Sequence, residues 1–435
     1  MDPVKFESQF RARTLDAPGL AAFARAQAGN PTLEWPPKVL DPDNLLWIAL
    51  FFSSDVELAR ADVAAKEAAL VTARQRVNPS VTAEAGRNKT PDSVATYSFS
   101  SAFTIETAGK RGLQILEAEK ALEAARLGVW EAAWTTRAKV RTALVAHYFA
   151  GRRLESLRAE LAVRTEIAGI WEKRLVAGEA SRPEVESARA ERAGLLSAIA
   201  NAEGEAERGV AGIGDAAGLP TAALGSRRMD LTKLEALPGA GELPIATIRK
   251  AGQVHRADIR RVLAQYDAAD AGLRLQLAQR YPNVVLSPSY LFQEGFASYV
   301  LGATLDALPV FHRGEGQLAE RKAERDKIAV EFRALQAHVR DETDSALTKY
   351  TAAVSEWAAT RGDAARVQAG REAGAAAALR AGEGDRLDVV TVRLGSFGVK
   401  RAELDALERG QLALGALEDA VQGALGGWMR MGEVK

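Results

Sequence analysis

The sequence contains no cysteine among its 435 residues. It therefore has no disulfide, no thiolate metal site, no nucleophilic thiol and no cysteine that could carry a lipid. An excess of one charge is also missing, because 57 lysine and arginine residues balance 57 aspartate and glutamate residues. Without excess positive charge, the composition does not favour nucleic acid or an anionic membrane surface as a partner.

Long hydrophobic runs are missing as well. The longest, from Leu45 to Phe52, is far shorter than the roughly 20 residues of a transmembrane helix, so no membrane-spanning helix is predicted. The first 20 residues lack the basic and apolar regions of a secretory signal. We expect either a protein that stays inside the cell or one whose signal peptide has been removed. Because the sequence has no cysteine, it does not indicate whether the protein works in an oxidising or a reducing compartment.

Residue patterns typical of catalysis or metal binding are not found either. Gly109–Gly112 and Gly212–Gly214 lie outside any strand–loop–helix unit that could bind phosphate, and no Ser-His-Asp set stands out. We therefore predict no enzyme activity, no metal site and no cofactor. The four histidines are scattered without metal-ligand spacing, at His147, His255, His312 and His338.

What the sequence does contain is an internal repeat. Residues 55–81 match residues 258–284 without a gap, so Asp55 corresponds to Asp258 and Pro79 to Pro282, both 203 positions later. Further on, Ala177-Gly178-Glu179 recurs 204 positions later as Ala381-Gly382-Glu383. This period is far longer than that of solenoid or propeller repeats and indicates two fused copies of one unit.

The first copy predicts a helix, a β-hairpin and a long helical hairpin. Apolar residues at 3-4 spacing form a coiled-coil-like helix that Pro79 ends. Alternation of apolar and polar residues predicts a β-hairpin over 80–106. A proline-free stretch then predicts one very long helix, or two nearly continuous ones, from Gly112 to about Leu175. After a bend near Gly178, a return helix must run antiparallel.

The start of this return helix has the form of a capping box, with Ser181 followed three residues later by Glu184. The second copy repeats the order, with a hairpin over 283–306 and a long helix from about Glu315 to a bend near Gly382. Its return helix shows the clearest apolar stripe: Leu404, Leu407, Leu414, Leu417, Val421, Leu425 and Trp428.

The chain thus divides into five segments. Closely spaced prolines predict an extended N-terminal arm over residues 1–44. Repeat 1 covers 45–213, a Gly/Pro-rich connector covers 214–245, repeat 2 covers 246–430, and 431–435 form a C-terminal tail.

The strands suggest a membrane environment. The best-defined ones are about ten residues long, the length of a transmembrane β-strand, and each has an apolar face opposite a face rich in serine and threonine. A single such hairpin would more often cover a globular core. Two of them, joined to helices too long for such a core, favour lipid. Four strands cannot close a barrel, so two chains supplying eight strands or three supplying twelve would be needed, and a lumen wide enough for solutes favours twelve.

The order helix, Asn78-Pro79, hairpin, Thr107-Ala108-Gly109-Lys110-Arg111, long helix, Ala-Gly-Glu bend and return helix resembles the TolC-type outer-membrane efflux proteins. The resemblance covers roughly residues 40–430, and Glu106–Arg111 looks most like the heavy-metal efflux subgroup. It implies an α+β, TolC-like fold with long antiparallel coiled-coil helices and an internal twofold repeat. It also implies a homotrimer whose twelve strands form one barrel in the bacterial outer membrane, above a periplasmic helical tunnel.

The resemblance further implies function and partners. The chain would be the exit duct of a tripartite efflux system, passing substrate to the exterior together with a periplasmic adaptor and an inner-membrane pump. The adaptor would dock at the two helical bends, Gly178-Glu179 with Arg182 and Gly382-Glu383 with Arg386. The tunnel constriction would lie at Asp388 and Thr391, where some family members carry two acidic residues.

Other interpretations of these residues remain open. Gly178 and Gly382 could serve only as helix terminators. Asp388 could be an acid that is favoured by a helix N-terminus. Arg182 and Arg386 could be solvated cations. We interpret Lys110 and Arg111 as interfacial cations. The alternative to a duct is a soluble coiled-coil scaffold or tether without channel activity. The substrate and the identity of the partners are not given by the sequence.

Overall fold

The computed structural model describes residues 2–87, 95–225, 227–293, 295–306 and 311–431. Two compact units are distinguished. The first, here called the bend unit, comprises residues 1–58, 129–256 and 338–435, and the second, the strand unit, comprises 59–128 and 257–337. Each unit combines residues from both sequence repeats. The repeats are therefore not two separate domains, because neither repeat forms a compact unit without the other.

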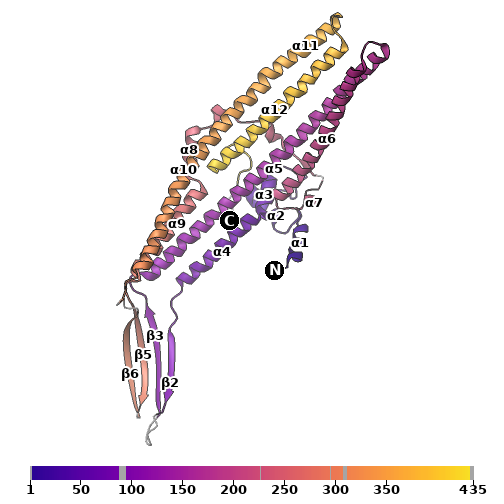
Figure 1. The fold of residues 1–435 in the computed structure, drawn as a ribbon. Coiled ribbons are helices and arrows are strands. Elements are labelled where there is room, and N and C mark those ends of the chain that lie inside the picture. The colour runs from indigo at the N-terminus through magenta and orange to yellow at the C-terminus, as the bar shows by residue number, and fades with distance from the viewer. Residues whose placement is uncertain (1, 88–94, 226, 294, 307–310, 432–435) are drawn as a thin grey trace. The chain divides into compact units, whose positions relative to one another are not determined.

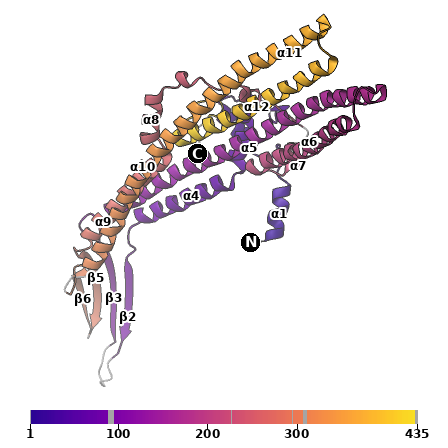
Figure 2. The same ribbon diagram turned by 45° about the horizontal axis from the view of Figure 1, so that its top comes forward.

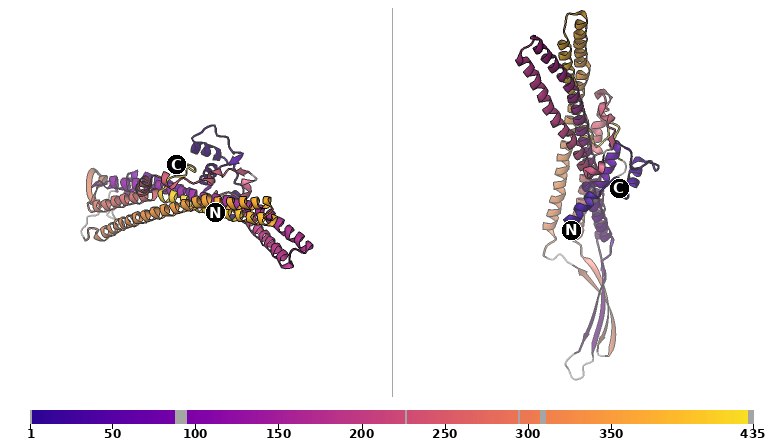
Figure 3. Two further views of the ribbon diagram at one scale, coloured as in Figure 1. Left: turned by 90° about the horizontal axis from the view of Figure 1, so that it is seen from above. Right: turned by 90° about the vertical axis from the view of Figure 1, so that its right-hand side faces the viewer.

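The strand unit contains one four-stranded antiparallel sheet (Figure 1). Its strands follow the order β2 (Ser80–Gly86), β3 (Thr96–Ile105), β5 (Asn283–Gln293) and β6 (Phe296–Asp306). The two hairpins predicted from the sequence thus pair with each other through β3 and β5, and β2 and β6 form the two edges. The side view shows the four strands as one twisted ribbon (Figure 3), as expected for L-amino acids.

The register separates polar from apolar side chains, as the alternation predicted. Thr82, Ser100 and Ser289 are neighbours across β2, β3 and β5 on the polar face. On the other face, Tyr290 and Tyr299 are register partners with ring centroids 5.3 Å apart. Three apolar residues interrupt the polar face, as the sequence already indicated: Val285, Leu291 and Val300.

Pro288 lies in the interior of β5, where proline is unusual because it has no backbone N–H to donate. The ladder between β3 and β5 runs from Tyr97 to Ser100 and resumes at Phe103, so it is interrupted where β3 faces Pro288. On the opposite side, Pro288 keeps its place in the ladder as the partner of Leu301 in β6. The missing donor therefore affects only the pairing between the two hairpins.

Four helices continue from the sheet region along the strand unit. They are α4 (Ser54–Arg74), α5 (Lys110–Ala177), α9 (Ala257–Ala278) and α10 (Glu315–Ala359), of which α4, α5 and α10 extend beyond this unit. Ala124, Leu127 and Ala264 form a small apolar cluster between α5 and α9. The predicted long helix of the first repeat is one continuous helix of 68 residues.

The bend unit contains two antiparallel helical hairpins (Figure 2). In the first, α5 is followed by α6 (Arg182–Ala216), and Leu154 packs against Leu195 and Ile199. In the second, α11 (Ala365–Ala381) is followed by α12 (Arg386–Val421). The predicted fold class, α+β with long antiparallel helices and four strands, is confirmed. No helix among the described residues is both long enough and apolar enough to cross a membrane.

The long helix of the second repeat contains a short π-helical turn, Thr360–Ala364, between α10 and α11. Arg361 places its guanidinium 5.2 Å from the ring of Trp357 at this turn. Beyond it, Gln368 is buried and donates to the Val392 carbonyl of α12 at 2.7 Å. The first repeat has no such interruption, since α5 is an unbroken α-helix.

The N-terminal segment and the connector hold the shorter elements. Helices α1 (Pro3–Arg11) and α2 (Leu20–Ala28) correct the expectation of an extended arm over 1–44. Pro3 occupies the first helical turn, where no backbone N–H is required, so it starts a helix instead of breaking one. Strand β1 (Val39–Leu40) pairs with β4 (Arg228–Met229) of the connector. The remaining elements are α3 (Pro42–Phe52), α7 (Thr221–Leu224), η1 (Thr232–Glu235), η2 (Ala240–Glu242) and α8 (Ile245–Val254).

The apolar stripe of the last helix extends beyond the helix itself. Helix α12 ends at Val421, because Gln422 adopts a left-handed conformation with φ of 48°. Leu425 and Trp428, which the sequence placed on the helix, lie in the following segment instead. Both still pack inward: Leu425 contacts the core around Tyr350, and Trp428 is buried. The spacing therefore identified buried residues correctly but overestimated the length of the helix.

A buried ionic cluster joins α5 to α12 inside the bend unit. The side chains of Arg137, Arg141 and Glu418 are 0%, 3% and 0% exposed, and both guanidinium groups donate to Glu418 Oε2 at 2.7 Å. Gly415 makes room for this arrangement, because a Cβ there would lie 2.8 Å from Arg141 Nε. Burial raises the pKa of the neighbouring Asp419 to about 6.

The cluster also holds the C-terminal segment. Arg137 Nε donates to the Met429 carbonyl at 2.9 Å, and the Gly426 N–H donates to Glu418 Oε1 at 2.7 Å. Trp428 stacks on Arg141, with 4.4 Å between the guanidinium carbon and the ring centroid. Segments far apart in the sequence are thus held by one set of charged groups.

Replacing Glu418 tests the cluster. We expect Glu418→Gln to lower the free energy of unfolding by about 3 kcal/mol, because two buried guanidinium groups would lose the carboxylate they share, and only Arg137 would keep an acidic neighbour, Asp419 at 3.7 Å. Glu356→Gln, which removes a pair with the exposed Arg409, should cost less than about 1 kcal/mol. Chemical denaturation followed by circular dichroism measures both, and equal effects would contradict a special role for Glu418.

Candidate functional site

The two predicted bends have the same backbone geometry. Gly178 and Gly382 adopt left-handed φ angles of 77° and 75°. At the first bend, the Glu179 N–H donates to the Arg174 carbonyl at 2.8 Å, and at the second the Glu383 N–H donates to the Ala378 carbonyl at 3.0 Å. Both glycines therefore terminate their helices by the same motif, which satisfies carbonyls at the helix end. This role is independent of any partner protein.

The return helices also begin alike. The Glu184 carboxylate accepts from the backbone N–H and the hydroxyl of Ser181, both at 2.7 Å, which lowers the pKa of Glu184. At the second bend, Asp388 accepts from the Asp385 N–H at 3.1 Å, and Asp385 accepts from the Leu387 N–H at 2.6 Å. Asp388 thus has the helix-capping role that was the alternative to a constriction.

Capping does not remove Asp388 from solvent. Asp388 and Thr391 are both exposed and lie three residues apart, on one face of the first turns of α12. A carboxylate at Asp388 and a hydroxyl at Thr391 therefore point from the same side of the helix near the bend.

The second bend is attached to the first helical hairpin. Asp385 forms an ion pair with Arg174 near the end of α5, and this contact together with the Leu387 N–H lowers the pKa of Asp385. Arg386 donates to Glu166 through Nε and Nη2, at 2.9 and 2.6 Å. These ion pairs cross from α12 to α5.

An apolar cluster lies beneath these pairs, where Val163 and Ile167 of α5 pack on Val390 of α12. The corresponding arginine of the first bend, Arg182, is exposed on the first turn of α6. Arg386 is therefore engaged within the chain, and the two arginines that the sequence treated as equivalent differ in their environment.

A second constellation lies where the strands meet the helices, and sequence reasoning did not find it. Lys110, at the start of α5, is buried and donates from Nζ to the Tyr281 carbonyl and to Asn283 Oδ1, both at 2.6 Å. Thr107 Oγ1 donates to the Pro282 carbonyl at 2.6 Å. The end of the first hairpin thus holds the start of β5.

The interpretation of Lys110 as an interfacial cation is therefore wrong. Its ammonium group is directed at carbonyl oxygens of the same chain, because Ala108 and Gly109 turn the backbone with φ angles of 55° and 69°. Burial lowers the pKa of Lys110, while the charges of Glu106 and Asp306 act in the opposite direction. The signal in the sequence was the Thr107–Lys110 motif, but the carbonyl that Lys110 binds belongs to Tyr281, 171 residues away.

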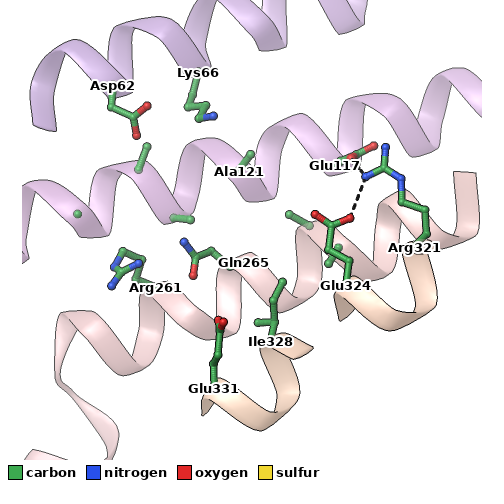
Figure 4. A pocket seen from close by; sticks show the side chains of 15 residues that line it. Asp62, Lys66, Glu117, Ala121, Arg261, Gln265, Arg321, Glu324, Ile328 and Glu331 are labelled. Atoms are coloured by element: carbon green, nitrogen blue, oxygen red, sulfur yellow. Dashed lines mark hydrogen bonds and ion pairs between the residues drawn. The ribbon is translucent and has the colours of Figure 1, made fainter. Parts of the chain in front are cut away.

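A cavity of about 520 Å³ opens between α4, α5, α9 and α10 in the strand unit (Figure 4). Its floor consists of small residues such as Ala121, and its walls carry both charges. Arg321 Nη1 lies 3.4 Å from Glu324 and 3.8 Å from Glu117. Arg321 thus lies between acids of α5 and α10, and no group of at least three potential metal ligands occurs among the described residues.

Comparison with known proteins identifies the architecture. No protein-family model matches the sequence, and no curated protein matches it significantly. The outer-membrane channel OprN matches with a TM-score of 0.71 at 18% identity, over 88% of this chain and 90% of that one. The chain has the TolC-like fold.

Two further solved structures agree. The outer membrane protein VceC from Vibrio cholerae matches with a TM-score of 0.70 at 19% identity, over 94% of this chain and 99% of that one. The Campylobacter jejuni outer membrane channel CmeC matches with a TM-score of 0.69 at 14% identity, over 90% of each chain. At these identities the likeness establishes the TolC-like fold and not a shared activity.

Replacing Lys110 tests the junction between hairpin and helix. We expect Lys110→Met to lower the free energy of unfolding by about 2 kcal/mol, because the buried oxygens of Tyr281 and Asn283 would lose a charged donor. Lys120→Met is the matched control, since Lys120 is partly exposed and pairs with Glu123. Hydrogen exchange at residues 283–286 should rise only in the first variant. A uniform change in both variants would contradict the role of Lys110.

Proposed function

We propose that this chain is the exit duct of a tripartite efflux system, acting as a homotrimer in the bacterial outer membrane. Substrate would pass from the periplasm to the exterior through the duct without chemical change and without a cofactor. The helices would lie in the periplasm and meet an adaptor, and an inner-membrane pump would supply the energy. The fold shared with outer-membrane channels supports this proposal.

The observation that carries the proposal is the sheet with two open edges. Among the described residues, β2 and β6 each have a partner on one side only. Open edges expose unpaired N–H and C=O groups, which hydrocarbon does not tolerate. Pairing of β6 of one copy with β2 of the next would remove both edges, and three copies would supply twelve strands.

The two faces of the sheet suit this arrangement. The face with Tyr299 and Leu301 is strongly exposed in the single chain, with relative exposures of 84% and 73%. Such a surface is stable against lipid and costly in water. The opposite face presents the hydroxyls of Thr82, Ser100 and Ser289, which would line a water-filled lumen.

The bends would be the adaptor-docking tip. We propose that Gly178, Glu179 and Arg182 form one docking element and that Gly382, Glu383 and Arg386 form the other. The exposed Arg182 supports contact with adaptor carbonyls, whereas Arg386 would have to exchange its partner Glu166. Engagement at the second bend would then compete with its attachment to α5.

Asp388 and Thr391 would mark the constriction of the tunnel. Threefold symmetry would bring three Asp388 carboxylates toward the axis, where like charges favour cations. Thr391 would contribute a neutral ring in place of a second acidic one.

The substrate would be a metal ion if the chain belongs to the heavy-metal efflux subgroup, which the segment Glu106–Arg111 resembles.

The alternative is a soluble scaffold whose hairpins only cap the long helices. Membrane extraction separates the two proposals, when the chain is expressed with a signal peptide. Recovery from the soluble fraction as a monomer, without detergent, would eliminate the duct.

Strand pairing between copies can be tested by cross-linking, because the chain has no cysteine of its own. We expect Thr82→Cys combined with Val300→Cys, one on each edge strand, to give covalent trimers with a short bifunctional maleimide. Denaturing electrophoresis would show a ladder that ends at three chains. Each single variant should stay monomeric, because the neighbouring edge strand would then carry no cysteine.

The matched control places both cysteines on inner strands of the same chain. Ser100 and Ser289 are direct partners in β3 and β5, so Ser100→Cys with Ser289→Cys should cross-link within the chain and stay monomeric on the gel. Monomers alone from the edge pair, in membranes that contain the protein, would contradict a closed barrel.

Adaptor docking predicts that bulk at the bends blocks export. We expect Gly178→Trp and Gly382→Trp to abolish export in cells with the partner pump, while size-exclusion chromatography still shows trimers. Alanine at the same positions is the matched control. Its Cβ would meet nothing within 4 Å, and the left-handed conformation costs only about 1–2 kcal/mol. Normal export by both tryptophan variants would exclude docking at the bends.

A further inference from the structure

We propose that the polar face of the sheet makes the duct favour cationic over anionic solutes, and that Glu84 sets this preference. The proposal rests on the duct function above and adds the charge class of the solutes that pass. Cationic and neutral small molecules would cross readily, and anionic ones poorly.

The strands carry charge of only one sign. β2, β3, β5 and β6 contain no lysine, arginine or histidine, and their two charged residues are Glu84 and Asp306. Ser98 is the register partner of Glu84, and its hydroxyl donates to Glu84 Oε2 at 3.3 Å. Glu84 therefore projects from the hydroxyl-rich face, the face that would meet water inside the barrel.

The two acids differ in their surroundings. Asp306 is the register partner of Asn283, whose side chain accepts from Lys110 Nζ at 2.6 Å. Because Asp306 acts on the pKa of Lys110, this end of the sheet has a nearby positive charge. Glu84 lies toward the other end of β2 and accepts from a neutral hydroxyl. Arg87, the next basic residue along the chain, follows the end of β2.

Symmetry would multiply this charge. Three chains would place three Glu84 carboxylates around one lumen, among hydroxyls such as Ser100 and Ser289 that solvate ions of either sign. Walls of low dielectric constant focus the field of such charges into the lumen. The field extends over a Debye length of about 8 Å at physiological ionic strength and only about 3 Å at 1 M salt. The preference should therefore be clear in dilute salt and weak in concentrated salt.

Reversal potentials of the full-length chain in planar lipid bilayers test the proposal. In a dilute potassium chloride gradient, we expect wild type to show a permeability ratio of potassium to chloride above one. Glu84→Gln should lower this ratio on the order of twofold, and Glu84→Lys should bring it below one. Repeating the measurement in concentrated salt should bring wild type and Glu84→Gln together.

Asp388→Ala is the comparison variant, because Asp388 is the other acid proposed to face the duct. An independent role for Glu84 predicts that the fold-changes caused by the two substitutions multiply in the double variant. An unchanged ratio in Glu84→Gln and Glu84→Lys, or a wild-type ratio below one, would overturn the proposal while leaving the duct intact. A wild-type protein that inserts and conducts no ions would contradict the duct itself, and the charge preference with it.

Discussion

The buried cluster of Arg137, Arg141 and Glu418 is the interaction on which the bend unit depends. Desolvating these three charges is costly and is offset only when each keeps its partners. Those partners belong to α5 of the first repeat, α12 of the second and the segment around Met429. The cluster therefore fixes which helix faces meet. Apolar side chains such as those of Val163 and Val390 could pack in several registers, but a buried carboxylate that joins two guanidinium groups cannot.

Both compact units use the same principle of joining the two repeats. In the bend unit, Asp385 after the second bend pairs with Arg174 before the first. In the strand unit, Lys110 after the first hairpin binds Tyr281 before the second. Each repeat leaves surfaces that only the other repeat covers. A single copy would expose charges that are buried in this chain and would leave the β3 or β5 edge unpaired.

Local signals were sufficient to predict the elements of the fold. Pro79 and Pro282 correctly signalled helix ends, although α4 and α9 stop a few residues earlier, at Arg74 and Ala278. Gly178 and Gly382 end helices by a left-handed turn. The long-range contacts could not be predicted. Arg137 and Glu418 are 281 residues apart, and each reads as an ordinary helix-surface charge in its own segment. The same limit concealed the partner of Lys110. The prolines in the first 44 residues led to the wrong prediction of an extended arm for a different reason, because proline is tolerated in the first turn of a helix.

The π-helical turn at Thr360–Ala364 has a consequence for symmetry. A π-turn takes one more residue than an α-turn, so every side chain beyond it is rotated by about 100° relative to an uninterrupted helix. The buried face of α11, marked by Gln368, is thus out of phase with that of α10. The unbroken α5 keeps its phase throughout. The long helices of the two repeats therefore present different faces at corresponding positions, although the repeats share one sequence pattern.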